Sequence, residues 1–405
     1  MKTTALLACC LLIGAGVPAT AQISDDVVKI GVINDQNSQF AYAAGQTSVL
    51  AAKMAVEDFG GKVLGKPIEI LSADHQNKPD TASVIVRKWA DVEKVDAFAD
   101  ATGSGVALAI QQVAREKNKT FLIASAATSE LTGKSCNETS TQWSYDTYAL
   151  SNVVAREIVR RGGKDWYFIT ADYAFGHALE KDATKFITDA GGKVLGGVKI
   201  PVNSPDFSSF LLQASSQQFK VLALATAGGD TINLIKQAAE FRVIKPGQEL
   251  ASLLFYINDI ESLGLDTAKG LLLANSFYWD MNDETRAWAK RFMTYSGGKL
   301  PNMLQAGLYA GVTHYLKAIQ AAGTDEPKAV AKKMRETPVN DFYNKNVEIR
   351  PDGRVLHRMF LMQVKSKEDS KYAYDYYKLI GELAGKDAFR PTSEGGCPLI
   401  AQEAK

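Results

Sequence analysis

The sequence predicts an α/β protein built from two doubly wound lobes. Short apolar segments alternate with helical patterns from Val27 onward, and the alternation restarts after Tyr145, which is typical of βαβ units and parallel sheets. The hexapeptide GGKVLG also occurs twice, at Gly60–Gly65 and Gly191–Gly196, each time between a helical segment and a strand-like one. The repeat could reflect only a helix-ending turn that the chain needs at both places, because paired glycines end helices. Its similar position in the two halves favours two lobes of like architecture.

The first half is expected to alternate strands with helices. The helix at 45–59 is amphipathic, because Val49, Ala52 and Val56 fall on one face. Alternating or continuous apolar residues predict the strands on either side of each helix. The expected strands lie at 27–34, 67–73, 95–101 and 120–126, and the remaining helices at 79–92 and 105–117.

The second half repeats this order before the pattern changes beyond Trp279. No Pro/Ser-rich linker divides the halves, so short crossovers and a hinge are expected. A turn at Arg350–Arg354 joins two late strand-like runs. The expected strands lie at 165–171, 194–200, 220–226, 253–257, 346–349 and 355–364, and the helices at 149–161, 175–190, 206–218, 229–241, 283–295, 303–322 and 326–336.

The N-terminal segment predicts export. Residues 1–21 combine a lysine, an apolar run and an Ala-x-Ala motif at Ala19–Ala21, which together are typical of a secretory signal peptide. The apolar run is too short to span a bilayer. Cleavage after Ala21 would release a periplasmic protein, and Cys9 and Cys10 lie too early to be lipid-attachment sites.

The composition excludes several classes of partner. The chain is 46% hydrophobic and 22% charged, as in ordinary soluble globular proteins. Without Lys2 it carries 45 Lys plus Arg against 45 Asp plus Glu, so no electrostatic attraction to nucleic acid or anionic lipid is expected. No later segment is long and apolar enough for membrane insertion. We expect a monomer that acts on a small molecule.

Two cysteines remain after the signal peptide, Cys136 and Cys397. Both lie in polar, loop-like sequence. A disulfide is favoured over two free thiols in an oxidising compartment. A metal site is not expected, because neither CxxC nor clustered histidines accompany them.

The loops that follow the strands are the candidate binding regions, because ligands of open parallel sheets bind at the carboxyl ends of the strands. Loop 101–105 carries Thr102 and Ser104 before a helix, and Thr128 lies in the neighbouring loop 124–130. Hydroxyl groups and the free N–H groups of a helix start suit a ligand carboxylate. Ser104 could equally serve as an ordinary helix N-cap.

Signatures of enzymes are missing from these loops. Positions 102 and 106 are Thr and Val, which breaks the G-x-S-x-G pattern of a nucleophile elbow. Gly103 and Gly105 are followed by Leu108, which breaks the dinucleotide-binding pattern, and no P-loop occurs. No cofactor is expected. His75, beside Asp74, is the histidine whose loop best faces the predicted cleft.

Aromatic residues are frequent in the same loops. Core packing explains most aromatic residues, but those in loops at strand ends are better candidates for the walls of a pocket. The candidates are Phe40, Tyr42, Tyr173 and Phe175, with Phe277, Tyr278 and Trp279 further along.

The order of several motifs resembles the type I periplasmic binding proteins of the branched-chain amino acid group, the ligand-capturing subunits of ABC importers. The motifs are KIGV, AAKMAVEDFGG, GSGVALA, SAATSELTG, ADYAFGHAL and LIKQAAEF, and they cover nearly the whole mature chain. This resemblance implies two lobes joined by three crossovers that close on a ligand. It also implies a permease as partner.

The resemblance further implies roles for individual residues. Ser104, Thr128 and the backbone near Ala126 match the family's carboxylate cradle, and Phe175 matches an aromatic residue against the ligand. Asn258 or Asp259 falls where amino-acid binders place an acid for the ligand's ammonium group. Ala227 replaces the ring of the leucine-type binders, so the chain is most similar to the subset associated with aromatic carboxylic acids.

Two further conclusions follow from the resemblance. The implied divisions are a signal peptide at 1–21, a first lobe at 24–146 plus 279–357, a second lobe at 147–278 plus 358–391, and a tail at 392–405. The implied function is capture of an aromatic or bulky hydrophobic carboxylic acid for import. A binder of branched-chain amino acids, a sensor that serves a receptor and, least favoured, an enzyme are the alternatives.

Overall fold

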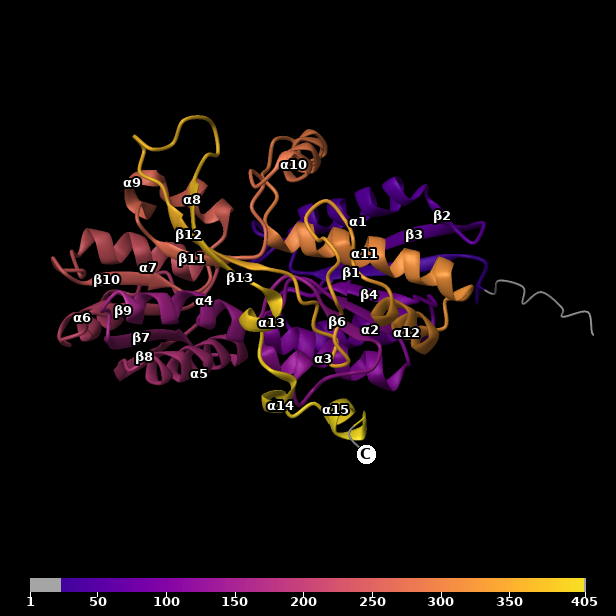
Figure 1. The fold of residues 1–405 in the computed structure, drawn as a ribbon, viewed down its shortest axis with the longest axis horizontal. Coiled ribbons are helices and arrows are strands. Elements are labelled where there is room, and N and C mark those ends of the chain that lie inside the picture. The colour runs from indigo at the N-terminus through magenta and orange to yellow at the C-terminus, as the bar shows by residue number, and fades with distance from the viewer. Residues whose placement is uncertain (1–22, 404–405) are drawn as a thin grey trace, which may run out of the picture.

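The structure, a computed structural model that describes residues 23–403, contains two parallel α/β units side by side along its long axis (Figure 1). The predicted signal peptide lies outside the described residues. The first unit is a sheet in the order β2-β3-β1-β4-β5-β6, in which all pairs are parallel except the β2-β3 hairpin. Its strands are β1 (Val28–Asn34), β2 (Lys62–Val63), β3 (Lys66–Asp74), β4 (Ala97–Asp100), β5 (Thr120–Ile123) and β6 (Ser140–Gln142).

The second unit is a parallel sheet in the order β10-β9-β7-β8. An antiparallel sheet, β11-β12-β13, lies along its helix α4. These strands are β7 (Asp165–Ala171), β8 (Lys193–Ile200), β9 (Val221–Ala225), β10 (Glu249–Ser252), β11 (Leu272–Asn275), β12 (Met359–Val364) and β13 (Tyr377–Leu383).

Helices cover both units. Of the later helices, α11 packs against α1, and in Figure 1 it lies among the early elements of the first unit. The first unit carries α1 (Gly45–Phe59), α2 (Pro79–Asp91), α3 (Ser104–Glu116), η1 (Ser129–Thr132), α10 (Asp283–Ser296), α11 (Met303–Ala322) and α12 (Pro327–Glu336). The second carries α4 (Thr147–Arg160), α5 (Ala174–Asp189), α6 (Ser208–Ser215), α7 (Gly229–Glu240), α8 (Ile257–Leu263) and α9 (Leu265–Ala268). The tail contains α13 (Gly385–Ala388), α14 (Thr392–Gly395) and α15 (Pro398–Glu403).

The two units share one topology, which confirms the predicted fold class. The order β3-β1-β4-β5 in the first equals β8-β7-β9-β10 in the second. The two GGKVLG copies begin at the same joint, after the helix that follows the first strand. The first copy passes through β2 and ends before β3, whereas the second continues into β8. Gly60 ends α1 with φ of 97°, and Gly191 follows α5 with φ of 81°. This left-handed conformation favours glycine. We refer to the units as lobe 1 and lobe 2 and use the predicted boundaries.

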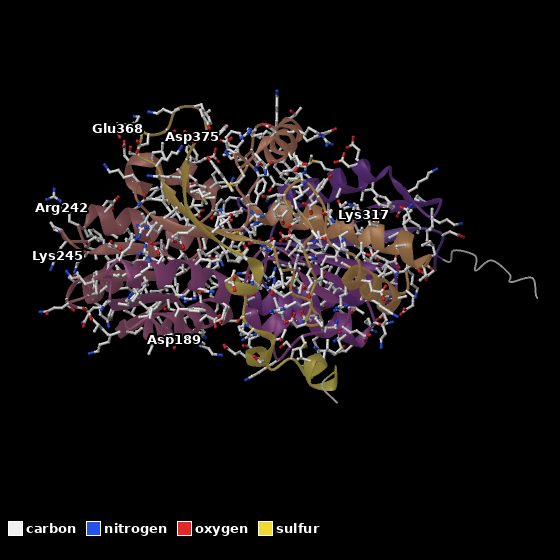
Figure 2. The ribbon with its side chains drawn as sticks, viewed as in Figure 1. Asp189, Arg242, Lys245, Lys317, Glu368 and Asp375 are labelled. Carbon is white, nitrogen blue, oxygen red and sulfur yellow. A yellow bond between two sulfur atoms is a disulfide. The ribbon has the colours of Figure 1, made fainter. Side chains whose placement is uncertain are left out.

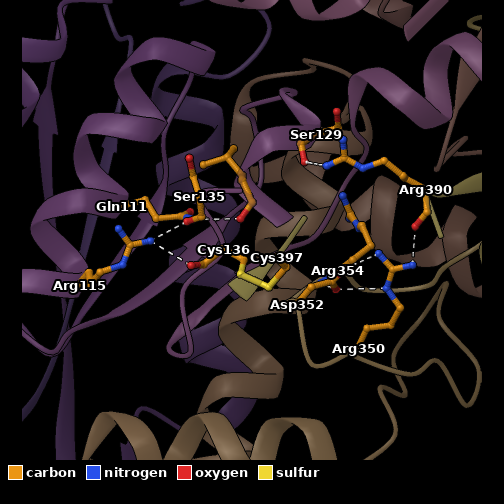
Figure 3. Close-up of a disulfide and its surroundings, with 11 residues drawn as sticks. Gln111, Arg115, Ser129, Ser135, Cys136, Arg350, Asp352, Arg354, Arg390 and Cys397 are labelled. Atoms are coloured by element: carbon orange, nitrogen blue, oxygen red, sulfur yellow. Dashed lines mark hydrogen bonds and ion pairs between the residues drawn. A yellow bond between two sulfur atoms is a disulfide. The ribbon is translucent and has the colours of Figure 1, made fainter. Parts of the chain in front are cut away.

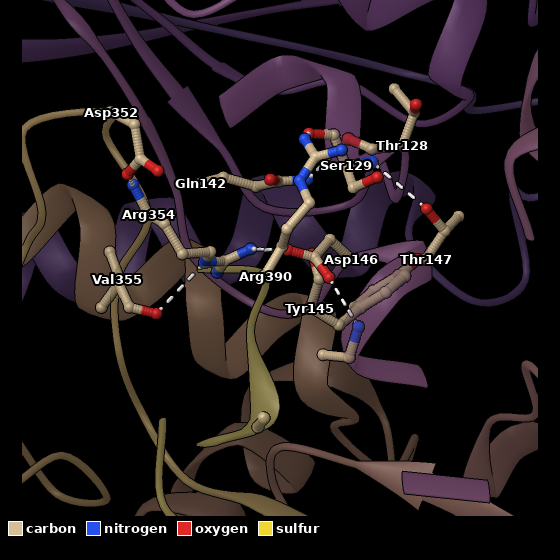
Figure 4. A network of polar contacts seen from close by, with 12 residues as sticks. Thr128, Ser129, Gln142, Tyr145, Asp146, Thr147, Asp352, Arg354, Val355 and Arg390 are labelled. Carbon is tan, nitrogen blue, oxygen red and sulfur yellow. Dashed lines mark hydrogen bonds and ion pairs between the residues drawn. The ribbon is translucent and has the colours of Figure 1, made fainter. Parts of the chain in front are cut away.

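Three segments connect the lobes at the hinge, as the resemblance implies: 143–146, 276–282 and 355–358. A buried arginine, Arg354, lies among them (Figure 4). It donates to the Tyr145 carbonyl at 3.0 Å, lies 3.6 Å from Asp146, and stacks over the Phe389 ring at 4.3 Å. Burial lowers the pKa of Arg354 to about 10, so the guanidinium remains charged at neutral pH and ties the crossovers together.

The C-terminal tail makes a further connection between the lobes. It leaves β13 in lobe 2 and ends on lobe 1, where Cys136 and Cys397 form the predicted disulfide with a Cα–Cα distance of 5.6 Å (Figure 3). Between β13 and Cys397, the tail residue Arg390 donates to the Ser129 carbonyl at 2.6 Å. Arg350 donates to the Arg390 carbonyl at 2.7 Å. The tail is therefore fastened by covalent and polar contacts.

Three strand predictions were wrong in whole or in part. The run 346–349 forms no strand, because Val347 and Ile349 make only isolated bridges, to Val339 and Val355. The run 253–257 is not a strand, because β10 ends at Ser252 and the following residues form the loop that leads into α8. A five-residue apolar run does not reveal its conformation by periodicity. Here Tyr256 is the N-cap residue of α8, and its N–H donates to the Asp259 carboxylate. In the run 355–364 only Met359–Val364 is a strand, since the first part is the third crossover.

The surface carries charges of both signs, in accord with the balanced composition. Figure 2 shows Arg242, Lys245 and Asp189 projecting from lobe 2, and Lys317 from lobe 1. Across residues 23–403, none of the helices combines the length and apolar character needed to cross a membrane.

Candidate ligand-binding site

A cavity lies between the lobes at the carboxyl ends of their strands. The space between atoms there is about 320 Å³, part of which is open to solvent. Strand ends of both parallel sheets and the first crossover contribute to it, as the rule for open α/β sheets requires. Its walls are Phe40, Ala43, Thr102, Gly103, Ser104, Ser125, Ala127 and Leu304 from lobe 1, Tyr145 from the first crossover, and Tyr173, Phe175, Ala227, Leu254 and Tyr256 from lobe 2.

A strained turn after β4 brings lobe 1 residues to the cavity. Asp100 and Ala101 have φ of 80° and 62°, which L-residues rarely adopt. The buried Asp100 carboxylate accepts from Asn34 at 2.9 Å and from the Ser125 hydroxyl, which holds the turn in place. At Gly103, with φ of 85°, a Cβ would lie 2.3 Å from the Asn77 side-chain oxygen. Only glycine fits there, and the turn aims the start of α3 at the cavity.

Ser104 lies in the wall and is the first residue of α3, while Gly103 occupies the N-cap position. Its Oγ accepts from the Thr128 N–H at 3.2 Å. Among the residues that the structure describes, the Ser104 O–H has no acceptor. The first N–H groups of α3 have no carbonyl partner within the helix. Ser104 and this helix start therefore present hydrogen-bond donors to the cavity.

Thr128 and Ala126 lie beside the cavity without lining it, and Ala127 between them forms the wall. The Thr128 hydroxyl accepts from the Glu130 N–H at 3.3 Å and caps η1. The Ala126 carbonyl accepts from Gln142 at 2.9 Å. This loop contributes Ser125 and Ala127 to the wall.

Thr102 lines the cavity, whereas His75 lies behind it. The Thr102 Oγ1 accepts from the Asp35 N–H at 2.7 Å and lies 3.1 Å from His75 Nε2. His75 Nδ1 accepts from the Asn77 N–H at 2.9 Å, so in the neutral ring Nε2 carries the proton. Burial lowers the pKa of His75 to about 4. Since the Thr102 oxygen accepts from both neighbours, its own O–H is left for the cavity.

Of the seven aromatic candidates, Phe40, Tyr173 and Phe175 line the cavity, whereas Tyr42, Phe277, Tyr278 and Trp279 do not. Tyr173 and Phe175 lie with ring centroids 5.8 Å apart, and Phe40 approaches from lobe 1. Ala227 also lines the cavity, but a Cβ at its neighbour Gly228 would lie 3.4 Å from the Phe40 ring. Phe40 thus fills part of the space that the small residues of this loop leave open.

Tyr42, Asn258 and Asp259 do not line the cavity and instead join the lobes. Asp259 is fully buried, and its carboxylate accepts from the Tyr42 hydroxyl and from the Tyr256 N–H at 2.7 Å. Burial raises the pKa of Asp259 to about 7. The Asn258 side chain accepts from Asn302 at 2.7 Å. Whichever of the two residues the resemblance assigns to an ammonium group, both side chains have protein partners.

Sequence reasoning missed several wall residues, above all Tyr145 and Tyr256. The Tyr145 hydroxyl donates to the Ser125 carbonyl at 3.0 Å and lies 2.8 Å from the Tyr256 hydroxyl, which must therefore be the donor in that pair. Burial raises the pKa of both phenols. Tyr256 was hidden in a segment predicted as a strand. Recognising Asp259 as an acid in the first turn of a helix would have placed Tyr256 in a loop at a strand end.

The wall is uncharged. Thr102, Ser104, Ser125 and the start of α3 contribute polar groups from lobe 1. The rings are those of Phe40 from lobe 1, Tyr145 from the first crossover, and Tyr173, Phe175 and Tyr256 from lobe 2. Hydroxyl and N–H donors hold a carboxylate by charge-assisted hydrogen bonds, whereas an ammonium group would find no carboxylate in the wall. In the described part of the chain, no group of three or more His, Cys, Asp or Glu side chains could hold a metal ion.

Two lobes of one topology around an interlobe cavity define a ligand-capturing binding protein. Residues 27–370 match the family of periplasmic binding proteins, and the chain belongs to that family. This family is periplasmic and serves ABC transporters as solute-binding subunits.

Three relatives illustrate the similarity. A periplasmic binding protein from Burkholderia mallei is 45% identical, with a TM-score of 0.90 over 92% of this chain and 99% of that chain. A branched chain amino acid ABC transporter periplasmic ligand-binding protein from Burkholderia xenovorans is 36% identical, with a TM-score of 0.83 over the same shares. A Leu/Ile/Val-binding protein homolog from Brucella melitensis is 24% identical over 86% of this chain and 90% of its own length.

Proposed function

We propose that this protein captures a small carboxylate ligand, with an aromatic or bulky hydrophobic body, and presents it to the permease of an ABC importer. The observation that carries the proposal is the uncharged cavity wall. Ser104, Thr102 and the start of α3 suit the carboxylate, and Tyr173 and Phe175 suit a ring. An amino acid would have to bury its ammonium group without a charged partner, which is costly.

The second candidate is a branched-chain amino acid. It is supported by the Burkholderia xenovorans protein, which is described as part of a branched chain amino acid transporter. For this candidate, Asp259 would have to exchange the Tyr42 hydroxyl for the ligand's ammonium group, because both carboxylate oxygens are already occupied. The uncharged wall makes this candidate the weaker one.

Binding without turnover is part of the proposal. The cavity has no nucleophile paired with a base, since His75 lies behind Thr102 and its Nε2 proton points to that hydroxyl. A sensor that serves a receptor would have the same fold and cavity. Genes for two permeases and two ATPases beside the gene would favour import over sensing. We further propose export after cleavage at Ala21 and a monomeric state, which gel filtration checks.

A ligand screen tests the function. Thermal unfolding is measured with benzoate, 4-coumarate, leucine and valine, and calorimetry follows on each ligand that stabilises the protein. A ligand at 100 times its dissociation constant adds about 2.7 kcal/mol to the free energy of unfolding. Binding of an aromatic acid, with no heat from leucine or valine, is expected. Tight binding of leucine or valine without binding of either aromatic acid would contradict the proposed ligand class.

A further inference from the structure

The first turn of α8 fastens the two lobes to each other beside the cavity. Its Asp259 accepts the hydroxyl of Tyr42, which lies 217 residues earlier in the loop after β1. The neighbouring Asn258 accepts from Asn302 at 2.7 Å and donates to the Leu300 carbonyl at 3.2 Å. Asn258 and Asp259 belong to lobe 2, whereas Tyr42, Leu300 and Asn302 belong to lobe 1. These bonds can exist only while the lobes are closed.

The geometry of these residues is that of a built contact. Asp259 is 0% exposed, and Asn302 is 2% exposed. Asp259 is held from within lobe 2 by the Tyr256 N–H, which fixes its free oxygen toward Tyr42. Asn302 is held from within lobe 1, where it also donates to the Ala43 carbonyl at 2.8 Å. Each side is thus preorganised before the lobes meet, which reduces the entropy lost on closing.

Another polar contact between the lobes has a different position. Ser129 of lobe 1 donates to Asp182 of α5 at 3.1 Å, and Thr147 donates to the same carboxylate at 2.5 Å. Thr147 lies directly after the first crossover, so this contact is at the hinge. A contact close to the hinge axis is expected to move little when the lobes open. The contacts of α8 involve no residue of the three crossovers.

We propose that Asn258 and Asp259, with Tyr42 and Asn302, form an interlobe latch that holds the lobes closed and slows ligand release without touching the ligand. The inference rests on the proposed capture between two closing lobes. It assigns positioning roles to residues whose place in the sequence suggested direct ligand contact. In the latch the Tyr42 hydroxyl is the partner of Asp259, so closure requires no ammonium group on the ligand.

Two matched variants test the latch. Tyr42→Phe removes one hydroxyl that bonds an aspartate across the lobes. Tyr309→Phe is the control, because the Tyr309 hydroxyl bonds Asp58 at 2.6 Å within lobe 1. Dyes are attached at Val92→Cys in lobe 1 and Leu212→Cys in lobe 2, which are 69% and 72% exposed. Single-molecule energy transfer then measures the closed fraction of the ligand-free protein.

The expected result is a ratio of closed to open molecules that falls about 10-fold in Tyr42→Phe and stays unchanged in Tyr309→Phe. Equal ratios in wild type and Tyr42→Phe would overturn the latch. A wild type with no closed molecules in the absence of ligand would also overturn it, because the latch would then be too weak to matter.

Stopped-flow release of benzoate gives an independent reading. The dissociation rate should rise about 10-fold in Tyr42→Phe, with the association rate nearly constant. An unchanged dissociation rate would overturn the latch. If wild type does not bind benzoate, that result counts against the proposed ligand class, and the energy-transfer comparison alone decides on the latch. Failure of the latch and failure of the proposed function therefore give different results.

Discussion

Ser104 shows how a single side chain is prepared for a ligand. The strained turn at Asp100 and Ala101 places it at the cavity, and the Thr128 N–H occupies one lone pair of its oxygen. The orientation of the hydroxyl is therefore restricted before any ligand arrives. A donor that is already oriented loses little entropy on binding.

Replacing Ser104 with Ala should weaken binding of the ligand by about 1.5–3 kcal/mol, because a hydrogen bond to a charged carboxylate is lost. Calorimetry on the acid found in the screen measures the change. Thr128→Ala is the comparison and should cost less affinity, since the Thr128 hydroxyl caps η1. Equal affinity of wild type and Ser104→Ala would place the carboxylate elsewhere.

His75 should make the protein sensitive to acid. Its pKa is about 4 in the folded protein because of burial, below the value of about 6.5 in an unfolded chain. Between these values the unfolded chain binds the extra proton, so stability is present above pH 6.5 and falls as the pH falls toward 4. The loss is on the order of 3 kcal/mol.

Urea unfolding of wild type and His75→Gln at pH 7 and pH 4.5 checks this. The variant should lose less stability between the two pH values. Parallel losses in both proteins would show that other groups control the acid sensitivity.

At the scale of elements, loops after strands carry the site and the tail secures the frame. The loop 253–256 supplies Leu254 and Tyr256 because β10 ends early at Ser252. The tail runs from β13 in lobe 2 to Cys397 on lobe 1, next to η1 and the first crossover. The disulfide at its end restricts the conformations of the unfolded chain between Cys136 and Cys397.

Removing the disulfide in a Cys136→Ser, Cys397→Ser protein should lower the free energy of unfolding. The bridge closes a loop of 261 residues, for which the chain-entropy model gives about 5 kcal/mol as an upper value. Urea unfolding of the oxidised wild type and the variant measures the difference. Peptide mass mapping without reductant should also show the cross-link, and two alkylatable thiols in the exported protein would contradict it.

For the whole molecule, the hinge depends on a buried ion network. Arg354 is 0% exposed and lies 3.6 Å from Asp146, the N-cap of α4 (Figure 4). Its guanidinium covers the Phe389 ring of the tail at 4.3 Å. The first crossover, the third crossover and the tail therefore all contact the charged side chain of Arg354.

Arg354→Met should destabilise the protein by about 3–5 kcal/mol, because it leaves the Asp146 carboxylate buried without its partner. The double variant Arg354→Met, Asp146→Asn should recover part of this loss, since neither charge remains. Thermal unfolding of the two variants measures both changes. A double variant that is less stable than the single one by the full cost of a second mutation would contradict the coupling.

The amino-acid sequence by itself determined the two α/β lobes, the pairing of Cys136 with Cys397 and the loops that carry Ser104 and Phe175. Periodicity, paired glycines and strand ends are local signals, and parallel sheets place strand ends at a common edge. Only the tertiary structure decided that Tyr256 lines the cavity, that Phe40 lies against Gly228, and that Asp259 bonds Tyr42. Those contacts depend on how two separately folded sheets are placed across a hinge, and no local pattern encodes that placement.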